Sequence, residues 1–248
     1  MKTKLFFAGC LLIATIASGQ NETVISSKNT GEITVTPPSF NETKISMEAD
    51  NNSLLNQYLT KNIQYPAQAK NCSYQGTEVV QFTVTADGKV TDFKVINSVC
   101  PIIDDEVVSV LKSTSGMWKP GSNNGTPVAM TKEVSFAFCI RELTDKSQSE
   151  IFKERAVNAF KKGTVAIYEE GNPKKALKFY NQGINYLPYE KGLLLMRGLC
   201  KYELGNQKGA MEDWNRMASL GETIDMNEFS GLIENMKGYN EAMAVINK

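Results

Sequence analysis

Two short alternating segments joined by a tight turn constrain the fold of this chain most strongly. Apolar and polar residues alternate along 80–85 and again along 92–95, and the pair Asp87-Gly88 lies between these segments. Alternation with a period of two predicts strands with one buried face, and Asp-Gly between two such strands is a strong signal for a β-hairpin. The chain must therefore build an antiparallel sheet around these residues.

The segments on either side of the hairpin predict how that sheet is covered. Residues 52–65 carry an apolar helical stripe that ends at Pro66, and Asp104 is placed to cap a short apolar helix. A last strand, at about residues 132–140, alternates large apolar side chains with small or polar ones. The order helix, hairpin, helix, strand predicts an α+β domain with a three-stranded antiparallel sheet and two helices on one face.

A series of landmarks through this region resembles the C-terminal domain of TonB, the periplasmic protein that grips outer-membrane transporters. The landmarks follow one another in order and cover about residues 50–142. They are Tyr65-Pro66, Gly76, the two hairpin strands, Asp87-Gly88, Asp104, Trp118-Lys119-Pro120-Gly121, Gly125 and the strand that ends in Phe136-Ala137-Phe138. The resemblance implies a protein-binding domain over residues 51–142, located in the periplasm or cell envelope.

The resemblance also implies two candidate binding segments. In TonB-like domains the stretch before Pro66 lies near the transporter peptide, so the candidates are Asn62, Ile63, Gln64 and Tyr65. The last strand is implied to be a sheet edge, whose unpaired backbone groups accept an extended peptide by β-augmentation. The candidates there are Lys132, Val134, Phe136 and Phe138. In a purely structural alternative, Pro66 only ends the first helix and Tyr65 only packs on the sheet.

The second half of the chain contains an internal repeat with a period of 34 residues. Three features recur at that spacing: Gly171-Asn172 and Gly205-Asn206, Ala176 and Ala210, Tyr180 and Trp214. This pattern resembles the tetratricopeptide repeat, which predicts an all-α domain of stacked helical hairpins over residues 150–248. A terminal helix within residues 225–247 is expected to cover the exposed end of the stack.

The concave surface of such repeats is a second candidate binding surface. Tyr168 and Tyr202 stand at equivalent positions on it and are candidate partner-binding residues. Self-packing of this surface, or its docking on the first domain, is an equally good interpretation.

The N-terminus has the pattern of an export signal. Lys2 and Lys4 precede an apolar run that ends in small residues, which predicts a signal peptide over residues 1–19. The run is too short for a comfortable membrane anchor, so we expect membrane association only through partners or through an uncleaved signal. Lipidation at Cys10 is the alternative. Residues 20–50 are rich in Asn, Thr, Ser and Glu and predict a flexible leader.

Composition and charge exclude several classes of function. The 27 basic and 27 acidic residues give a net charge of zero, so there is no basic field to attract nucleic acid. The absence of histidine removes the commonest general base and zinc ligand. The carboxylates of Asp104, Asp105 and Glu106 are better explained by the helix N-terminus than by a metal or acid–base site. We expect no catalytic residues, no metal or cofactor, no small-molecule substrate, and a protein partner.

The positions of two cysteines predict a disulfide. Cys72 lies just before the first hairpin strand and Cys100 just after the second. The two ends of an antiparallel hairpin meet, and exported proteins encounter oxidising conditions, so we expect a Cys72–Cys100 bond. The alternative is two free, half-buried thiols. Cys139 and Cys200 are expected to be packing residues.

These observations leave two functional hypotheses. The first is a TonB-like protein that contacts outer-membrane transporters and helps to energise uptake. The second is an exported scaffold that binds protein segments through the sheet edge and the repeat groove without energy input. The short, cleavable N-terminal segment and the lack of a long Pro- and Lys-rich arm count against full transduction. A hydrolase that uses Asp104 or Tyr65 has no convergent set of residues.

Overall fold

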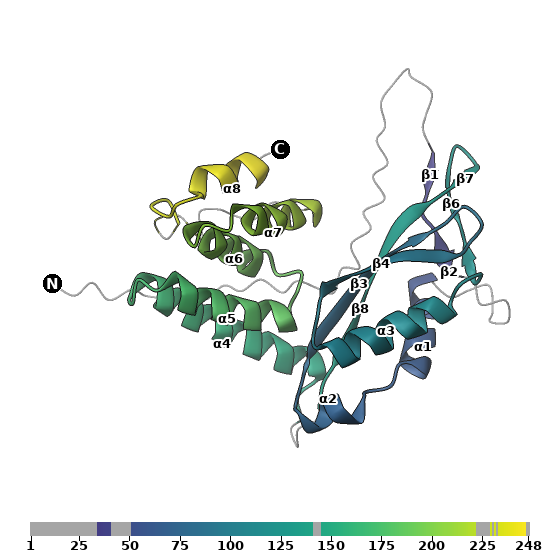
Figure 1. The fold of residues 1–248 in the computed structure, drawn as a ribbon, viewed down its shortest axis with the longest axis horizontal. Coiled ribbons are helices and arrows are strands. Elements are labelled where there is room, and N and C mark those ends of the chain that lie inside the picture. The colour runs from purple at the N-terminus through teal and green to yellow at the C-terminus, as the bar shows by residue number, and fades with distance from the viewer. Residues whose placement is uncertain are drawn as a thin grey trace.

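The computed structural model describes residues 34–40, 51–140, 145–221 and 233–246, together with 229 and 231. These residues form two parts that lie side by side (Figure 1). We call the described residues up to 140 the sheet domain and those from 145 onward the helical domain. The predicted signal peptide, with Cys10, lies outside the described residues.

The predicted β-hairpin forms the centre of the sheet domain. Strand β3 (Gly76–Val84) pairs antiparallel with β4 (Val90–Asn97) on one side and with β8 (Met130–Phe138) on the other. The turn requires glycine, because Gly88 has a φ of 77° and an added Cβ would lie 2.4 Å from the Trp118 carbonyl oxygen. The strand order β4-β3-β8 confirms the three-stranded antiparallel sheet.

Helices α1 (Asn51–Asn62) and α3 (Pro101–Ser113) cover one face of this sheet, as their apolar stripes predict. Their buried residues and those of the central strand form one core, made of Leu54, Leu55 and Leu59 from α1, Ile103, Val107 and Leu111 from α3, and Val80, Phe82 and Val84 from β3. Alternate residues of a strand point to one face, which explains why every second residue of β3 is in this core. A short additional helix, α2 (Ala67–Asn71), follows Pro66.

The start of α3 differs from the expectation that Asp104 caps it. The helix begins at Pro101, with Cys100 in the capping position. Proline is favoured in the first helical turn because its φ is already helical and it has no N–H to leave unpaired. Asp104 therefore lies inside the first turn, where its carboxylate accepts a hydrogen bond from the Ser98 hydroxyl (2.8 Å).

Part of the predicted leader belongs to the sheet domain. Residues 34–40 contribute two short strands, β1 (Val35–Thr36) and β2 (Ser39–Phe40). They pair with strands of the crossing segment that contains β5 (Trp118–Lys119), β6 (Gly121–Asn123) and β7 (Thr126–Val128).

Phe40 anchors this addition. Its side chain is 1% exposed, and its ring lies 5.3 Å from that of Trp118 and 5.4 Å from that of Tyr58. A flexible leader over all of residues 20–50 is therefore wrong for residues 34–40, because burying an aromatic ring offsets the cost of ordering the chain.

The helical domain consists of five helices among its described residues: α4 (Gln148–Tyr168), α5 (Pro173–Tyr186), α6 (Lys191–Glu203), α7 (Gln207–Ser219) and α8 (Tyr239–Ile246). The repeated asparagines begin the second helix of each pair. The side-chain oxygens of Asn172 and Asn206 each accept a hydrogen bond of 2.9 Å from a backbone N–H of the first helical turn. The 34-residue period of the sequence is thus a period of helix caps.

Two glycines allow the helices of each pair to approach closely. An added Cβ would lie 2.6 Å from the Tyr180 ring at Gly163, and 2.2 Å from the Trp214 indole nitrogen at Gly198. Both aromatic side chains are fully buried. The same pairing of glycine and aromatic residue in both hairpins agrees with a repeat architecture, and its assignment to the tetratricopeptide family stays a prediction.

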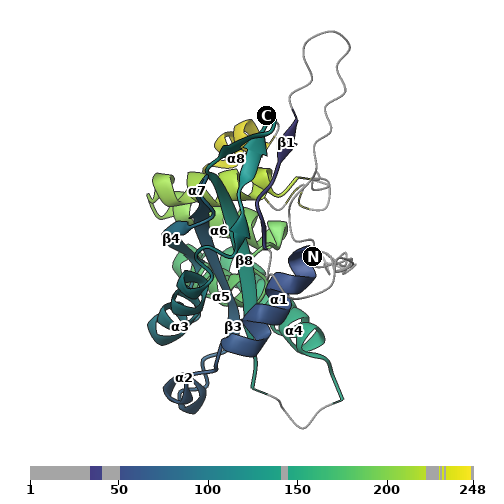
Figure 2. The ribbon, with the colours of Figure 1, turned by 90° about the vertical axis from the view of Figure 1, so that its right-hand side faces the viewer.

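The helical domain packs against part of the second face of the sheet, and Figure 2 shows the sheet in front of it. The Thr77 hydroxyl donates to the Tyr186 carbonyl (2.8 Å), and the Asn185 side-chain amide donates to the Gln75 carbonyl (2.7 Å). Val79 lies on this face and is 0% exposed. This face is therefore covered around Thr77 and Val79, whereas Thr131, farther along the same face, is exposed.

An ion pair joins β8 to the helical domain. The Arg216 guanidinium donates two hydrogen bonds, of 2.9 and 3.1 Å, to the Glu133 carboxylate, and it lies over the Tyr189 ring. Burial raises the pKa of the Tyr189 hydroxyl, and the neighbouring Glu133 carboxylate raises it further. Because bidentate arginine–carboxylate pairs have a defined geometry, this contact orients the two domains.

Candidate protein-binding edge

Strand β8 is an edge of the sheet in the part of the chain that the structure describes. All nine of its residues pair with β3, from Gly76 opposite Phe138 to Val84 opposite Met130, and no second strand pairs with its outer side. An edge strand presents a row of backbone N–H and C=O groups that another extended segment can pair with. The arrangement suits β-augmentation.

The direction of the backbone groups along β8 follows from one contact. The Gln148 side-chain amide, at the start of α4, donates to the Ala137 carbonyl (3.0 Å). Backbone direction alternates along an antiparallel strand, so residues in the same phase as Ala137 direct their N–H and C=O groups to the outer side. These residues are Thr131, Glu133 and Ser135. Gln148 thus occupies the outward carbonyl at one end of the edge strand. The outward backbone groups of residues 131–135 stay accessible to a partner.

The four candidate residues on β8 share the other phase. Their side chains point to the face covered by α1 and α3, where Lys132 and Val134 are each 8% exposed and Phe138 is 2% exposed. Phe136 is half-buried, with its ring 5.2 Å from that of Phe138. The structure therefore places these side chains together, but in the core. These side chains hold the edge strand in place, and a partner would contact the backbone of β8.

The second candidate segment meets β8 through a single aromatic residue. The Tyr65 ring packs edge-on against Phe138, with 5.3 Å between ring centres, and its hydroxyl donates to the Tyr74 carbonyl. Burial raises the pKa of that hydroxyl. Tyr65 therefore supports the end of the edge strand.

The three residues before Tyr65 have structural contacts of their own. The Asn62 side-chain amide donates to the Tyr58 carbonyl (2.8 Å), Ile63 is buried in the core, and the Gln64 N–H donates to the Glu106 carboxylate (2.8 Å). Asn62 and Gln64 have exposed side chains. These two exposed side chains are the parts of the segment that a partner can reach most directly.

With this geometry in view, the sheet domain can be compared with known proteins. Residues 61–140 match the family model of the Gram-negative bacterial TonB protein C-terminal. The match includes Tyr65 and the whole of β8, whereas the helical domain lies outside it. No curated protein matches the chain.

Two solution structures of the Helicobacter pylori TonB C-terminal domain are similar to part of the chain. The first is 22% identical, covers 39% of this chain and 88% of that one, and has a TM-score of 0.30. The second is 23% identical, covers 38% of this chain and 99% of that one, and has a TM-score of 0.31.

The candidate tyrosines outside the TonB C-terminal match contact the chain's own C-terminal segment. The Tyr168 hydroxyl lies 3.8 Å from the Met236 sulfur, and the Tyr202 hydroxyl donates to the Glu241 carboxylate (2.8 Å). An added Cβ at Gly238 would lie 2.6 Å from the Tyr202 ring. In these contacts the surface around Tyr168 and Tyr202 packs on another part of the same chain, which is the self-packing interpretation.

The predicted disulfide is absent. Cys72 is an exposed free thiol and Cys100 a buried one. Helix α2 ends at Asn71 with Cys72 as its C-cap, and a segment with a left-handed residue, Ser73 (φ 57°), leads from it to β3. The spacing along the chain suggested that Cys72 stands at the end of the hairpin, but it lies beside α2 instead. Cys139 is half-buried and Cys200 is buried.

Two residues that contact this edge strand were not found from the sequence. Gln148 reaches the edge, and Arg216 reaches Glu133, from helices far along the chain. No periodicity signals which helix meets which strand. Among the described residues, no helix combines the length and hydropathy needed to cross a bilayer. No group of three or more His, Cys, Asp or Glu side chains in that same part of the chain is placed to hold a metal ion.

Proposed function

We propose that the chain is a TonB-like interaction protein of the cell envelope that binds an extended segment of an outer-membrane transporter along β8. The observation that carries this proposal is the outer side of β8, which has no partner strand among the described residues. The family match supports it, because it spans this strand and because the TonB C-terminal domain is a non-enzymatic interaction domain.

Recognition on this edge works through the main chain. The candidate side chains of β8 are largely in the core, so the partner's backbone pairs with the outward groups of Thr131, Glu133 and Ser135. Each backbone hydrogen bond contributes about 1 kcal/mol net, so three residues with two groups each support a moderate affinity. Asn62 and Gln64 add side-chain contacts near the end of the strand.

The proposal extends to the whole chain. Residues 1–19 export the protein to the periplasm, residues 51–142 form the TonB-like unit, and residues 150–248 form tetratricopeptide-like repeats with a capping helix. Energy-coupled transport requires a tether to the inner membrane, which residues 1–19 provide if they are retained.

A second candidate function, an exported adaptor without energy input, is favoured by the docking of the helical domain on the sheet. The ion pair between Arg216 and Glu133 makes the two domains one unit that offers a second surface beside the edge. Mass spectrometry of the mature N-terminus separates the two functions. Gln20 as first residue supports the adaptor, whereas retention of residues 1–19 in inner-membrane fractions supports transduction.

Binding to the edge is tested by fluorescence anisotropy of the full chain with labelled synthetic peptides from the periplasmic segments of outer-membrane transporters. We expect saturable binding that Thr131→Pro weakens at least about tenfold, because proline removes an outward N–H that an edge strand can spare. The exposed side chain of Thr131 makes Thr131→Val the matched control, which keeps the N–H and should bind like the natural chain.

The outcome that overturns the proposal is equal binding by the proline and valine variants, once thermal unfolding shows that both are folded. Absence of saturable binding by any of these peptides overturns the transporter as partner.

A further inference from the structure

The first residue of α4 contacts the outer side of β8. The Gln148 side-chain amide donates to the Ala137 carbonyl (3.0 Å), and Ala137 belongs to the set of β8 residues whose backbone groups point outward. This is the row of groups that the proposed function offers to a partner. One acceptor of the row is therefore already occupied, by a helix that lies outside the TonB C-terminal match.

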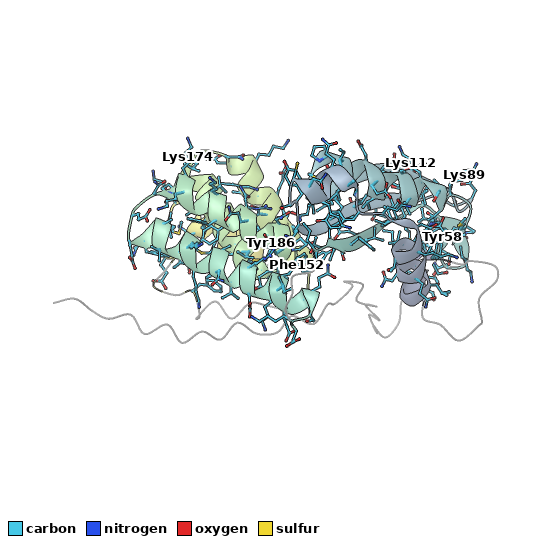
Figure 3. All side chains as sticks on the ribbon, turned by 90° about the horizontal axis from the view of Figure 1, so that it is seen from below. Tyr58, Lys89, Lys112, Phe152, Lys174 and Tyr186 are labelled. Atoms are coloured by element: carbon cyan, nitrogen blue, oxygen red, sulfur yellow. The ribbon has the colours of Figure 1, made fainter. Side chains whose placement is uncertain are left out.

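Several contacts fix the position of Gln148. The Ser147 hydroxyl accepts a hydrogen bond from the Glu150 N–H (3.3 Å), and the Glu150 carboxylate accepts one from the Ser147 N–H (2.7 Å), so α4 begins with a complete capping box. One turn later, the buried Phe152 ring lies 5.2 Å from that of Tyr186. Figure 3 shows both side chains on the side of the helical domain that faces the sheet domain. The start of α4 is thus anchored near the junction of the two domains, and Gln148 is held beside β8.

The outward residues before Ala137 are not closed in this way. They are Thr131, Glu133 and Ser135, and among the described residues no strand pairs with their outer side. The contact of Glu133 with the helical domain is made by its side chain, which binds Arg216 (2.9 Å). The backbone groups of these three residues remain for a partner, whereas the Ala137 carbonyl does not.

We propose that Gln148 sets the length of the partner segment that pairs with β8. The inference rests on the proposed function and concerns the same edge. The outward groups of Thr131, Glu133 and Ser135 lie within residues 131–135, which span about 17 Å of extended chain. The partner pairs along this stretch and turns away from the strand before Ala137. It is therefore a protein segment with a short extended part of about five residues.

An exchange of hydrogen bonds explains why the partner does not displace Gln148. A partner N–H that bound the Ala137 carbonyl would replace the Gln148 amide, which would return to water, so the number of hydrogen bonds would not increase. Longer pairing would also order two more residues of the partner and lose their conformational entropy. Displacement thus brings no net gain, and pairing stops at Ser135.

The test is an N-methyl scan of the transporter peptide that binds the full chain most tightly, measured by fluorescence anisotropy. Each N-methyl group removes one N–H of the peptide and leaves the protein unchanged. In the natural chain, three positions spaced two residues apart should each weaken binding at least about fivefold, because they donate to the carbonyls of Thr131, Glu133 and Ser135. N-methylation at the next position in this series, toward Ala137, should have no effect.

A variant of Gln148 makes the test specific. Gln148→Met removes the side-chain amide at nearly constant length and frees the Ala137 carbonyl. We expect a fourth sensitive position beside the other three, and about fivefold tighter binding of the unmodified peptide. The matched control is Gln207→Met, because Gln207 is the exposed first residue of α7, as Gln148 is of α4. This control should keep three sensitive positions.

The outcomes separate this inference from the proposed function. Four sensitive positions in the natural chain, or the same number in the natural chain and in Gln148→Met, overturn the role of Gln148 while pairing along β8 stands. Absence of saturable binding by any peptide, or binding that no N-methyl group weakens, overturns pairing along β8 and this inference with it.

Discussion

At the residue scale, Glu78 is a carboxyl group held in an apolar core. It lies on β3 opposite Phe136 and is 0% exposed. One of its oxygens accepts a hydrogen bond from the Val99 N–H (2.9 Å), and the other has no partner among the described residues. Burial raises the pKa of Glu78 to about 8, the Val99 N–H opposes this rise, and the nearby Asp104 carboxylate adds to it.

Stability should therefore depend on pH through this residue. A carboxyl group whose pKa is raised by folding is tolerated best when protonated, so its contribution is greatest below pH 4.5 and declines as pH rises toward 8. We expect the free energy of unfolding to fall across this window by roughly 3–5 kcal/mol, at about 1.4 kcal/mol per pKa unit. Urea unfolding between pH 5 and pH 9 measures it.

Glu78→Gln is the matched control for that prediction. The amide has nearly the same shape and does not ionise, so the decline in stability between pH 5 and pH 8 should largely disappear. A variant that retains the full pH dependence of the natural chain would show that another group is responsible.

At the element scale, the edge character of β8 predicts a pattern of hydrogen exchange. The amides of Lys132, Val134 and Phe136 point to β3 and should exchange slowly, whereas those of Thr131 and Glu133 point outward. We expect at least about a tenfold difference in rate between the two sets, measured by NMR. Equal protection of both sets would contradict a free edge and would remove the basis for peptide pairing.

The strands β1 and β2 show what a short element gains from tertiary contacts. Each has two residues, too few to be stable as an isolated ribbon. They persist because Phe40 fills a space between the rings of Tyr58 and Trp118. The buried ring adds to the strand pairing and to the hydrogen bonds between Thr34 and Asn124 that join this segment to the domain.

At the scale of the whole molecule, the two domains should unfold together because Arg216 and Glu133 join them. Arg216→Ala leaves the Glu133 carboxylate, which is only 24% exposed, without its partner, so we expect a loss of about 1–3 kcal/mol. Trp118 reports on the sheet domain and Trp214 on the helical domain. Their indole N–H signals in NMR spectra, followed through a urea titration, measure both transitions.

The two indole midpoints should coincide in the natural chain and separate in Arg216→Ala. Lys208→Ala, which removes an exposed charge from the same helix, is the control and should change neither. Coincident and unshifted midpoints in Arg216→Ala would show that this ion pair does not couple the domains.

The sequence by itself determined the elements with local signals. The hairpin follows from alternation around Asp87-Gly88, and the helical pairs follow from Asn172 and Asn206 as caps with Gly198 facing Trp214. These features depend on residues that are close along the chain or that recur at a fixed period. Local backbone and side-chain chemistry is sufficient to specify them.

Only the tertiary structure decided which surfaces stay accessible. It buried Phe40, placed the helical domain over Val79, turned Lys132 and Val134 of β8 into the core, and brought the C-terminal segment onto Tyr168. Burial depends on contacts between residues far apart along the chain, and no local pattern encodes those contacts. The outer backbone of β8 is a candidate site because, among the described residues, no strand pairs with that edge.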